Sequence, residues 1–363
     1  MNKYFSYIIG IIVVFTSCTK DNEFQREDGL KGINITTTFV GEMKIYLIGT
    51  GKVNIDWGDG SRETVTLTYS DYILDNPIPH TYAKTGAKKI VITGKNIVGL
   101  STNTAFSPWG STSKITALDI SRCPELKFLY CRGELLTSLD VSKNTALEAL
   151  YCEGNQLTSL DISTNTALKH LSCSYNQLTS LDIYKNTALE TLRCSNNQLS
   201  MLVFSNNTAL KYLECENNQL TSLDVSKNTA LEYLLCSDNQ LTSLDVSGCT
   251  VLEYLYCHEN KLTSLDVSNN AVLKNLYCYG NLLTSVVVSN FTEMVALACN
   301  RNNLNYATLN TIFDALPNWI DSYSGRWVDV RDTPGITQAG YDRTIATDKN
   351  WIVTEYEHQI GSR

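Results

Sequence analysis

The stretch Leu157-Thr-Ser-Leu-Asp-Ile-Ser-Thr-Asn-Thr-Ala-Leu-Lys-His-Leu-Ser-Cys173-Ser-Tyr-Asn-Gln177 decides the fold of this chain. Its pattern returns every 21 residues, and nine cysteines keep that spacing without an insertion or a deletion. These cysteines are Cys131, Cys152, Cys173, Cys194, Cys215, Cys236, Cys257, Cys278 and Cys299. A fixed period of this length predicts a solenoid, in which each repeat is one coil stacked on the next.

Each repeat holds two copies of a shorter pattern, Leu-x-x-Leu-x-Cys at 147–152 and Leu-x-x-Leu-x-Ile at 157–162. Side chains of a strand alternate between its faces, so these apolar residues are predicted to point inward and form the core. One strand is expected around Leu150 and another around Leu160, which gives strands on both sides of each coil. A single coil cannot fold alone, but stacked coils bury a continuous core.

The repeated cysteines stand where the pattern places a leucine, so we interpret them as small buried apolar residues. Neighbouring coils would hold them about 4.8 Å apart, but parallel Cβ vectors do not converge to the ~3.8 Å separation of a disulfide. A free, buried ladder is therefore expected, and one thiol per coil does not make a metal site. Two columns of asparagine, such as Asn155 and Asn165, are predicted to bond backbone groups at sharp corners.

Tyrosines gather at the outward strand positions of the later coils. The candidate ligand-binding residues are Tyr212, Tyr233, Tyr254, Tyr256, His258, Tyr277 and Tyr279. Aromatic side chains clustered on one rigid face suit contact with an extracellular protein or a glycan. Tyrosine also has a high β propensity, so a purely structural cross-strand ladder is the alternative.

The repeat region, from 114 to 304, resembles leucine-rich repeats of the short bacterial type Leu-x-x-Leu-x-Cys-x-x-Asn-x-Leu-x-x-Leu-Asp-Leu. That resemblance implies a mainly β solenoid with strands on both sides of a flattened coil and few helices. Residues 305–363 depart from the repeat and are predicted to form a small α/β cap. Helical spacing at 309–316 and 340–351 and a strand-like run at 326–330 favour a cap that covers the last strand edge.

Residues 30–99 are predicted to form a separate β domain, because short β-branched runs alternate there with turn residues. The segment contains Trp57-Gly-Asp-Gly60, followed later by His80-Thr-Tyr82. It resembles the polycystin-type (PKD) immunoglobulin-like sandwich, in which a structural role for His80 is expected. Asp56 and Asp59 beside the glycines could bind calcium, but such carboxylates usually bond their own turn.

The first 18 residues resemble a bacterial lipoprotein signal peptide. Lys3 precedes a short apolar run, and Phe15-Thr-Ser-Cys18 places small residues before a cysteine that would be lipidated. An ordinary signal peptide with an incidental cysteine is the alternative. Residues 19–29 are predicted to form a polar tether. The acidic start of this tether is similar to the surface-export tag of Bacteroidetes-type bacteria. The expected location is the outer membrane or cell surface, with a lipid anchor.

The chain has 29 Lys and Arg against 37 Asp and Glu, a net charge of −8, and no basic run, so nucleic acid is not an expected partner. No phosphate loop, metalloprotease motif or nucleophile elbow occurs, so we expect no enzyme and no cofactor. An aspartate column, including Asp161 and Asp182, is interpreted as a solvated face, with cation binding as the alternative. The expected function is a non-enzymatic surface module for protein binding or adhesion. The alternative is a glycan-binding accessory lipoprotein.

Overall fold

The computed structural model describes residues 32–68, 77–102, 114–288, 291–319 and 325–355. The chain divides into two compact units, Met1–Leu147 and Glu148–Arg363. The expected signal peptide, the tether and Cys18 lie outside the described residues. No helix among the described residues is long and apolar enough to cross a membrane.

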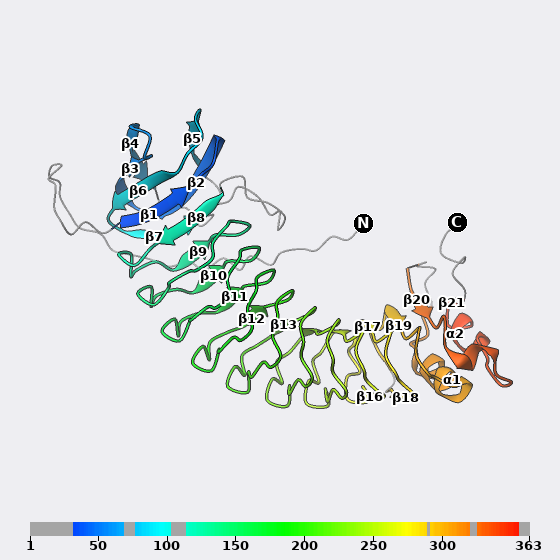
Figure 1. Ribbon diagram of the computed structural model, residues 1–363. Coiled ribbons are helices and arrows are strands. Elements are labelled where there is room, and N and C mark those ends of the chain that lie inside the picture. Colours follow the sequence, from blue (N-terminus) through cyan, green and yellow to red (C-terminus); the bar gives the residue numbers. More distant parts are fainter. Residues whose placement is uncertain (1–31, 69–76, 103–113, 289–290, 320–324, 356–363) are drawn as a thin grey trace. The chain divides into compact units, whose positions relative to one another are not determined.

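The first unit contains two sheets, shown in blue to cyan in Figure 1. One is antiparallel, in the order β4 (Arg62–Leu67), β3 (Gly51–Asp56), β6 (Lys88–Gly94), β1 (Gly32–Thr37) and β8 (Ile115–Asp119). The other contains β5 (Pro77–Tyr82), β2 (Gly41–Gly49), β7 (Ile97–Ser101) and β9 (Phe128–Tyr130). Alternate apolar residues are fully buried, as the period of a strand requires: Ile33, Ile35, Met43, Ile45, Ile90 and Ile92.

The boundary expected between 99 and 114 does not separate the sheets from the repeats. Strand β8 pairs antiparallel with β1, and β9 pairs parallel with β7. Ile115-Thr-Ala-Leu118 has the same alternation as half a coil, so the sequence alone did not show that it adds to the edge of β1. Strands β5 and β7 were also not anticipated as strands.

The second unit is a stack of coils joined by one parallel sheet. Successive strands pair in register, so that Leu150, Leu171 and Leu192 lie opposite one another. The sheet contains β10 (Ala149–Tyr151), β11 (His170–Ser172), β12 (Thr191–Arg193), β13 (Tyr212–Glu214), β14 (Tyr233–Leu235), β15 (Tyr254–Tyr256), β17 (Asn275–Tyr277), β19 (Ala296–Ala298), β20 (Trp327–Asp329) and β21 (Ile352–Thr354). Within this unit, Figure 1 shows these strands along the inner side of the curved stack.

The expectation of strands on both sides of every coil is wrong for most of the described coils. On the second side only β16 (Ser264–Asp266) and β18 (Ser285–Val287) form a ladder. The Asp of Leu-Asp-Ile accepts a bond from the amide two residues later both in a coil without this ladder, as Asp161 does from Ser163, and in β16, as Asp266 does from Ser268, each at 2.9 Å, so the bond does not decide whether the ladder forms. This local bond turns the chain at the end of the half-repeat. The outer side of a curved stack also spreads its coils, which disfavours a second continuous ladder.

The asparagine ladder joins each coil to its neighbours, as the sequence predicted. The Nδ2 atom of Asn197 donates to the carbonyls of Cys194 and, one coil earlier, Cys173, both at 3.1 Å. Its Oδ1 accepts from the amide of Leu178 at 3.0 Å. The described cysteines are all buried and are thiols rather than halves of a disulfide. The buried ladder is thus present in the structure.

The C-terminal segment continues the sheet through β20 and β21. Helix α1 (Tyr306–Ala315) begins after Asn305, whose side chain accepts from the amide of Thr308. It buries Leu309, Ile312 and Phe313. A short 3-10 turn η1 (Pro334–Thr337) and helix α2 (Thr344–Thr347) complete the segment, so the second helical piece is shorter than expected.

Candidate functional site

The seven candidate ligand-binding residues lie in three neighbouring columns on the outward face of the long sheet. We call this surface the tyrosine face. The first column holds Tyr212, Tyr233 and Tyr254, which pair in register across β13, β14 and β15. The second holds Tyr256 and Tyr277 of β15 and β17. The third, two residues later on each coil, holds His258 and Tyr279.

Rings of one column stack on each other along the solenoid. Tyr233 and Tyr254 have ring centroids 4.5 Å apart with planes 5° from parallel. Tyr256 and Tyr277 lie 4.5 Å apart at 11°, and His258 and Tyr279 lie 4.3 Å apart at 15°. The 21-residue period therefore produces the close, ordered aromatic surface that the sequence predicted.

Further contacts cover the ends of the aromatic columns. The guanidinium of Arg193 lies 4.8 Å from the ring centroid of Tyr212. Trp327 lies 5.7 Å from Tyr277, and Arg301 lies 5.7 Å from Tyr279. Because ring faces are turned to neighbours in the same column, the columns offer ring edges and hydroxyls to a ligand. Stacking of a sugar on a free aromatic face is correspondingly disfavoured.

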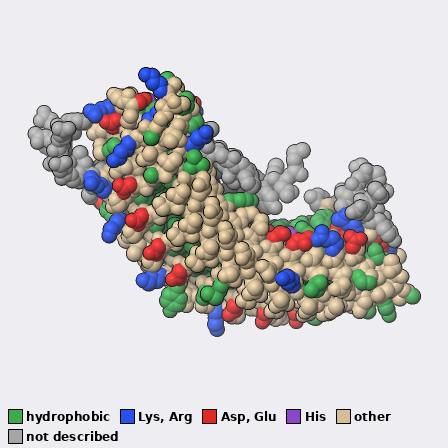
Figure 2. All heavy atoms as spheres, viewed as in Figure 1, with side chains coloured by type: hydrophobic (Ala, Val, Ile, Leu, Met, Phe, Trp, Pro, Cys, Tyr) green, Lys and Arg blue, Asp and Glu red, His purple; other side chains and the backbone are tan. Residues whose placement is uncertain are grey.

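Four carboxylates among these columns and at the adjoining corner were missed by the sequence reasoning. We call them the acidic set: Glu214, Glu216, Asp238 and Glu259. Glu214 and Glu216 lie in the second and third columns, and Asp238 and Glu259 lie one position after the third, so reading these columns through every coil and one position further would have found them. Figure 2 shows charged side chains beside hydrophobic ones along the inner edge of the later coils.

The outer members of the acidic set are paired with arginines. Arg193 Nε lies 3.4 Å from Glu214 Oε2, to which the hydroxyl of Tyr212 donates at 3.2 Å. Burial, followed by the charge of Glu214, raises the pKa of Tyr212. Arg301 forms an ion pair with Glu259, two coils away. A Cβ at the intervening Gly280 would meet both side chains at 2.7 Å, so glycine leaves room for this bridge.

Glu216, on the first coil of the face, is mostly withdrawn from solvent. Burial raises the pKa of its carboxyl, and the like charges of Glu214 and Asp238 raise it further. A bond from the hydroxyl of Ser237, at 2.7 Å, opposes this shift. Burial lowers the pKa of His258, so its imidazole is neutral at neutral pH and does not act as a cation for the nearby Asp238.

The corner after the third column has left-handed backbone. Asn217, Asp238, Glu259 and Arg301 have φ values of 55°, 53°, 50° and 52°. Glycine and asparagine adopt this conformation most easily, and Gly280 occupies the same corner with φ of 62°. A glutamate or arginine here is an unusual choice, and it places a charged side chain beside the tyrosine face.

In the first unit, the PKD-like motif residues form a structural cluster. His80 stacks on Trp57 at 4.5 Å, and its Nε2 lies 2.8 Å from Asp59 Oδ2. The hydroxyl of Tyr82 donates to the carbonyl of Trp57 at 2.8 Å. Asp59 also accepts from Ser61, and these bonds hold the pKa of Asp59 well below its usual range. Asp56 pairs with Arg62 at 2.8 Å. Both carboxylates considered for calcium therefore have protein partners.

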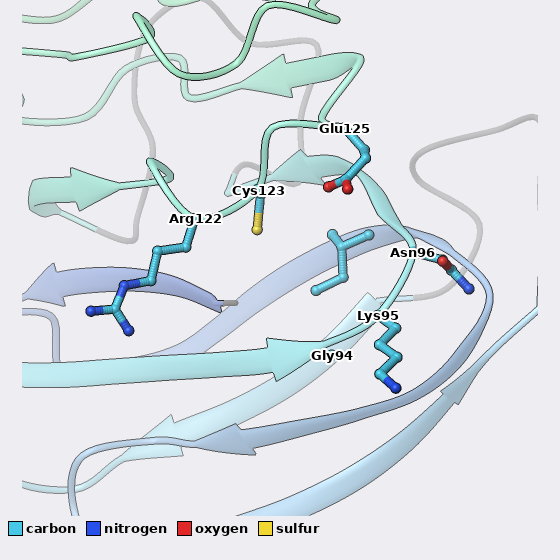
Figure 3. A pocket seen from close by; sticks show the side chains of 7 residues that line it. Gly94, Lys95, Asn96, Arg122, Cys123 and Glu125 are labelled. Carbon is cyan, nitrogen blue, oxygen red and sulfur yellow. The ribbon is translucent and has the colours of Figure 1, made fainter. Parts of the chain in front are cut away.

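The first unit also has a small pocket between the end of β6 and a loop near residue 123 (Figure 3). Its volume is about 200 Å³, and its lining includes Lys95, Asn96, Arg122 and Glu125. Sites for small molecules are commonly 300–1,000 Å³, so this notch is small. Across the ranges that the structure describes, no group of three His, Cys, Asp or Glu could hold a metal ion.

The aspartate column on the second side of the coils has a structural role. Asp161, Asp224 and Asp266 each accept from the amide two residues later at 2.9–3.0 Å. These bonds lower the pKa of each carboxyl. The repeated Asp thus stabilises a turn, which agrees with its interpretation as a solvated face.

Comparison with known proteins shows which class of repeat the chain contains. Residues 229–270 match the model described as Leucine Rich repeats (2 copies). The functional domain of InlJ from Listeria monocytogenes, whose description includes a cysteine ladder, is 32% identical with a TM-score of 0.62. The match covers 73% of this chain and 55% of that domain, so the chain spans about half of that relative.

A plant peptide hormone receptor, RGFR1, solved in complex with RGF2, shares the fold at 23% identity and a TM-score of 0.51. That match covers 59% of this chain and 37% of the receptor. No curated protein sequence matches the chain. The chain carries leucine-rich repeats stacked into a mainly β solenoid.

Proposed function

We propose that the chain is a cell-surface protein-binding module, without enzymatic activity, whose tyrosine face contacts an extracellular protein. The observation that carries this proposal is the ordered stack of tyrosines on the inner face of the solenoid. Tyrosine gives a large contact area at low entropic cost and often dominates protein interfaces. The inward leucines and cysteines hold the face rigid, so little ordering is needed on binding.

The glycan-binding alternative is less well supported by the ring geometry. Sugars are held in part by aromatic rings whose faces are free, whereas Tyr233 and Tyr254 turn their faces to each other. The hydroxyls that remain outward could still bond a glycan. The alternative therefore stays open to test.

We further propose that residues 30–99 form a PKD-like sandwich and that lipidated Cys18 anchors the chain at the outer membrane or cell surface. The stack of Trp57 and His80 with the Tyr82 bond supports the first part. The sequence around Cys18 supports the second. In this arrangement the anchor holds the solenoid outside the cell, where its inner face is accessible.

A selection from displayed fragments of extracellular proteins, run beside a glycan array, tests the proposed function. The probe is the chain without its first 18 residues, immobilised through its C-terminus. Fragments that bind this chain but not its Tyr254→Ala/Tyr256→Ala variant are expected. Glycan hits with the same dependence, and no protein hits, would favour the alternative. Hits that ignore both tyrosines and depend on the first unit would show that the solenoid is a spacer.

A further inference from the structure

The tyrosine face carries unbalanced negative charge. Across the coils from Tyr212 to Gly280, the three outward columns and the corner hold the four carboxylates of the acidic set and no lysine or arginine. Arg193 and Arg301 lie one coil beyond the two ends and pair with Glu214 and Glu259. Glu216 and Asp238, on the first two of these four coils, have no arginine partner of this kind.

Glu216 and Asp238 have weak compensation from their own face. Glu216 accepts from the neutral hydroxyl of Ser237. Asp238 lies 3.9 Å from the Nε2 atom of His258, an imidazole that burial keeps neutral. Glu216 and Asp238 also repel one another, because each is a like charge near the other.

A further polar group in the same column is unsatisfied. Ser195 is one coil before Glu216 and is 1% exposed. Its Oγ atom has no hydrogen-bond partner among the described residues. Buried polar groups are normally paired, so the coil next to Glu216 adds an unused hydroxyl at this end of the face.

The negative charge of Glu216 also destabilises the chain when no partner is bound. Burial disfavours the ionised carboxyl of Glu216, as its raised pKa indicates. A positively charged group placed between Glu216 and Asp238 would offset that cost. The stacked tyrosines beside it would exclude water and strengthen the attraction.

We propose that the occupant of the tyrosine face is an extended protein segment rich in lysine and arginine. Its cationic side chains reach Glu216 and Asp238, while the rest of the segment lies across the ring edges and hydroxyls of Tyr233, Tyr254 and Tyr256. This inference rests on the proposed function and specifies the chemistry of the partner. It also disfavours anionic partners, which the acidic set would repel.

Selection from a library of random linear peptides displayed on phage tests the inference. Peptides are selected on the chain without its first 18 residues, and those that lose binding to the Tyr254→Ala/Tyr256→Ala variant are sequenced. An excess of lysine and arginine in these peptides is expected. The dissociation constant of the strongest peptide is then measured for two charge variants.

The first variant is Glu216→Gln/Asp238→Asn, and its control is Asp161→Asn/Asp245→Asn on the second side of the coils. Both change the net charge equally. Weakening of at least about tenfold in the first and less than about twofold in the control is expected, because close charge pairs outweigh the distant field. Far-UV circular dichroism checks that both variants fold.

The outcomes separate the two proposals. Tyrosine-dependent peptides without excess basic residues, or equal weakening by both charge variants, would overturn the cationic partner and leave the protein-binding face standing. A selection in which no peptide depends on Tyr254 and Tyr256 would overturn both.

Discussion

At the scale of single residues, burial makes the thiols of the cysteine ladder slow to react. Burial raises the pKa of the Cys173 and Cys278 thiols to about 12, and only the thiolate reacts quickly. We predict that iodoacetamide at pH 8 labels the ladder slowly in the native chain and completely in denaturant. Mass spectrometry that finds disulfides within the ladder would contradict this prediction.

The same shifts predict a loss of stability at alkaline pH. The unfolded thiols release protons near pH 9, whereas Cys173 and Cys278 keep theirs to about 12. Their contribution to stability is full below pH 9 and falls as the pH rises through this window. Each thiol changes the free energy of unfolding by up to about 1.4 kcal/mol per pH unit.

Urea unfolding at pH 7.5 and pH 10 measures this effect. The matched control replaces Cys173, Cys194 and Cys215 with alanine, which lowers stability at both values but should reduce the dependence on pH. An unchanged pH dependence in that variant would show that other groups cause the alkaline loss.

The sequence predicted the residues of the core well and the charged residues of the face poorly. The strict 21-residue spacing predicted that the repeated cysteines are buried and that the tyrosines of the face share columns, because a column of identical residues is visible in the sequence alone. Glu216 and Asp238 were missed because their columns hold several residue types and no single repeated one. The left-handed corner at Glu259 could not be foreseen, since asparagine and glycine are the residues that usually signal it.

At the scale of elements, the asparagine ladder holds successive coils together. Asn218 donates to the carbonyls of Cys194 and Cys215 at 3.1 Å and accepts from the amide of Leu199 at 3.0 Å. We predict that Asn218→Ala lowers the free energy of unfolding by about 2–4 kcal/mol, because several buried backbone groups lose their partner. The exposed neighbour Gln219 offers the control, and Gln219→Ala should change it by less than about 0.5 kcal/mol. Similar losses in both variants would argue against the ladder.

The sequence pattern correctly predicted the strands of the inner sheet. It also predicted strands on the second side of the coils, where most of them do not form. The Leu-Asp-Ile half of each coil has the alternation of a strand, yet only β16 and β18 form a ladder on the second side. Pairing depends on the distance between coils, which curvature sets and a single repeat does not encode. Likewise, residues 115–118 have the alternation of half a coil, yet β8 pairs with β1.

At the scale of the whole molecule, the proposed anchor decides where the solenoid works. We predict that Cys18→Ala moves the chain from the membrane fraction to the soluble fraction, because the lipid on Cys18 supplies the attachment in the proposed anchor. Immunoblots of fractionated cells, with Cys249→Ala as the control, measure this. Retention of the Cys18 variant in membranes would exclude the anchor.

The central claim is that the tyrosine face is the contact surface, and one affinity measurement tests it most directly. The dissociation constant of the strongest displayed protein fragment is measured for the wild type, for Tyr254→Ala/Tyr256→Ala and for Tyr184→Ala/Met201→Ala. The last pair is 60% and 68% exposed on the second side of the coils. We predict a loss of more than about 2 kcal/mol in binding free energy for the first pair, with unchanged thermal unfolding, and little loss for the second. Equal affinity of all three chains for the fragment would contradict the account.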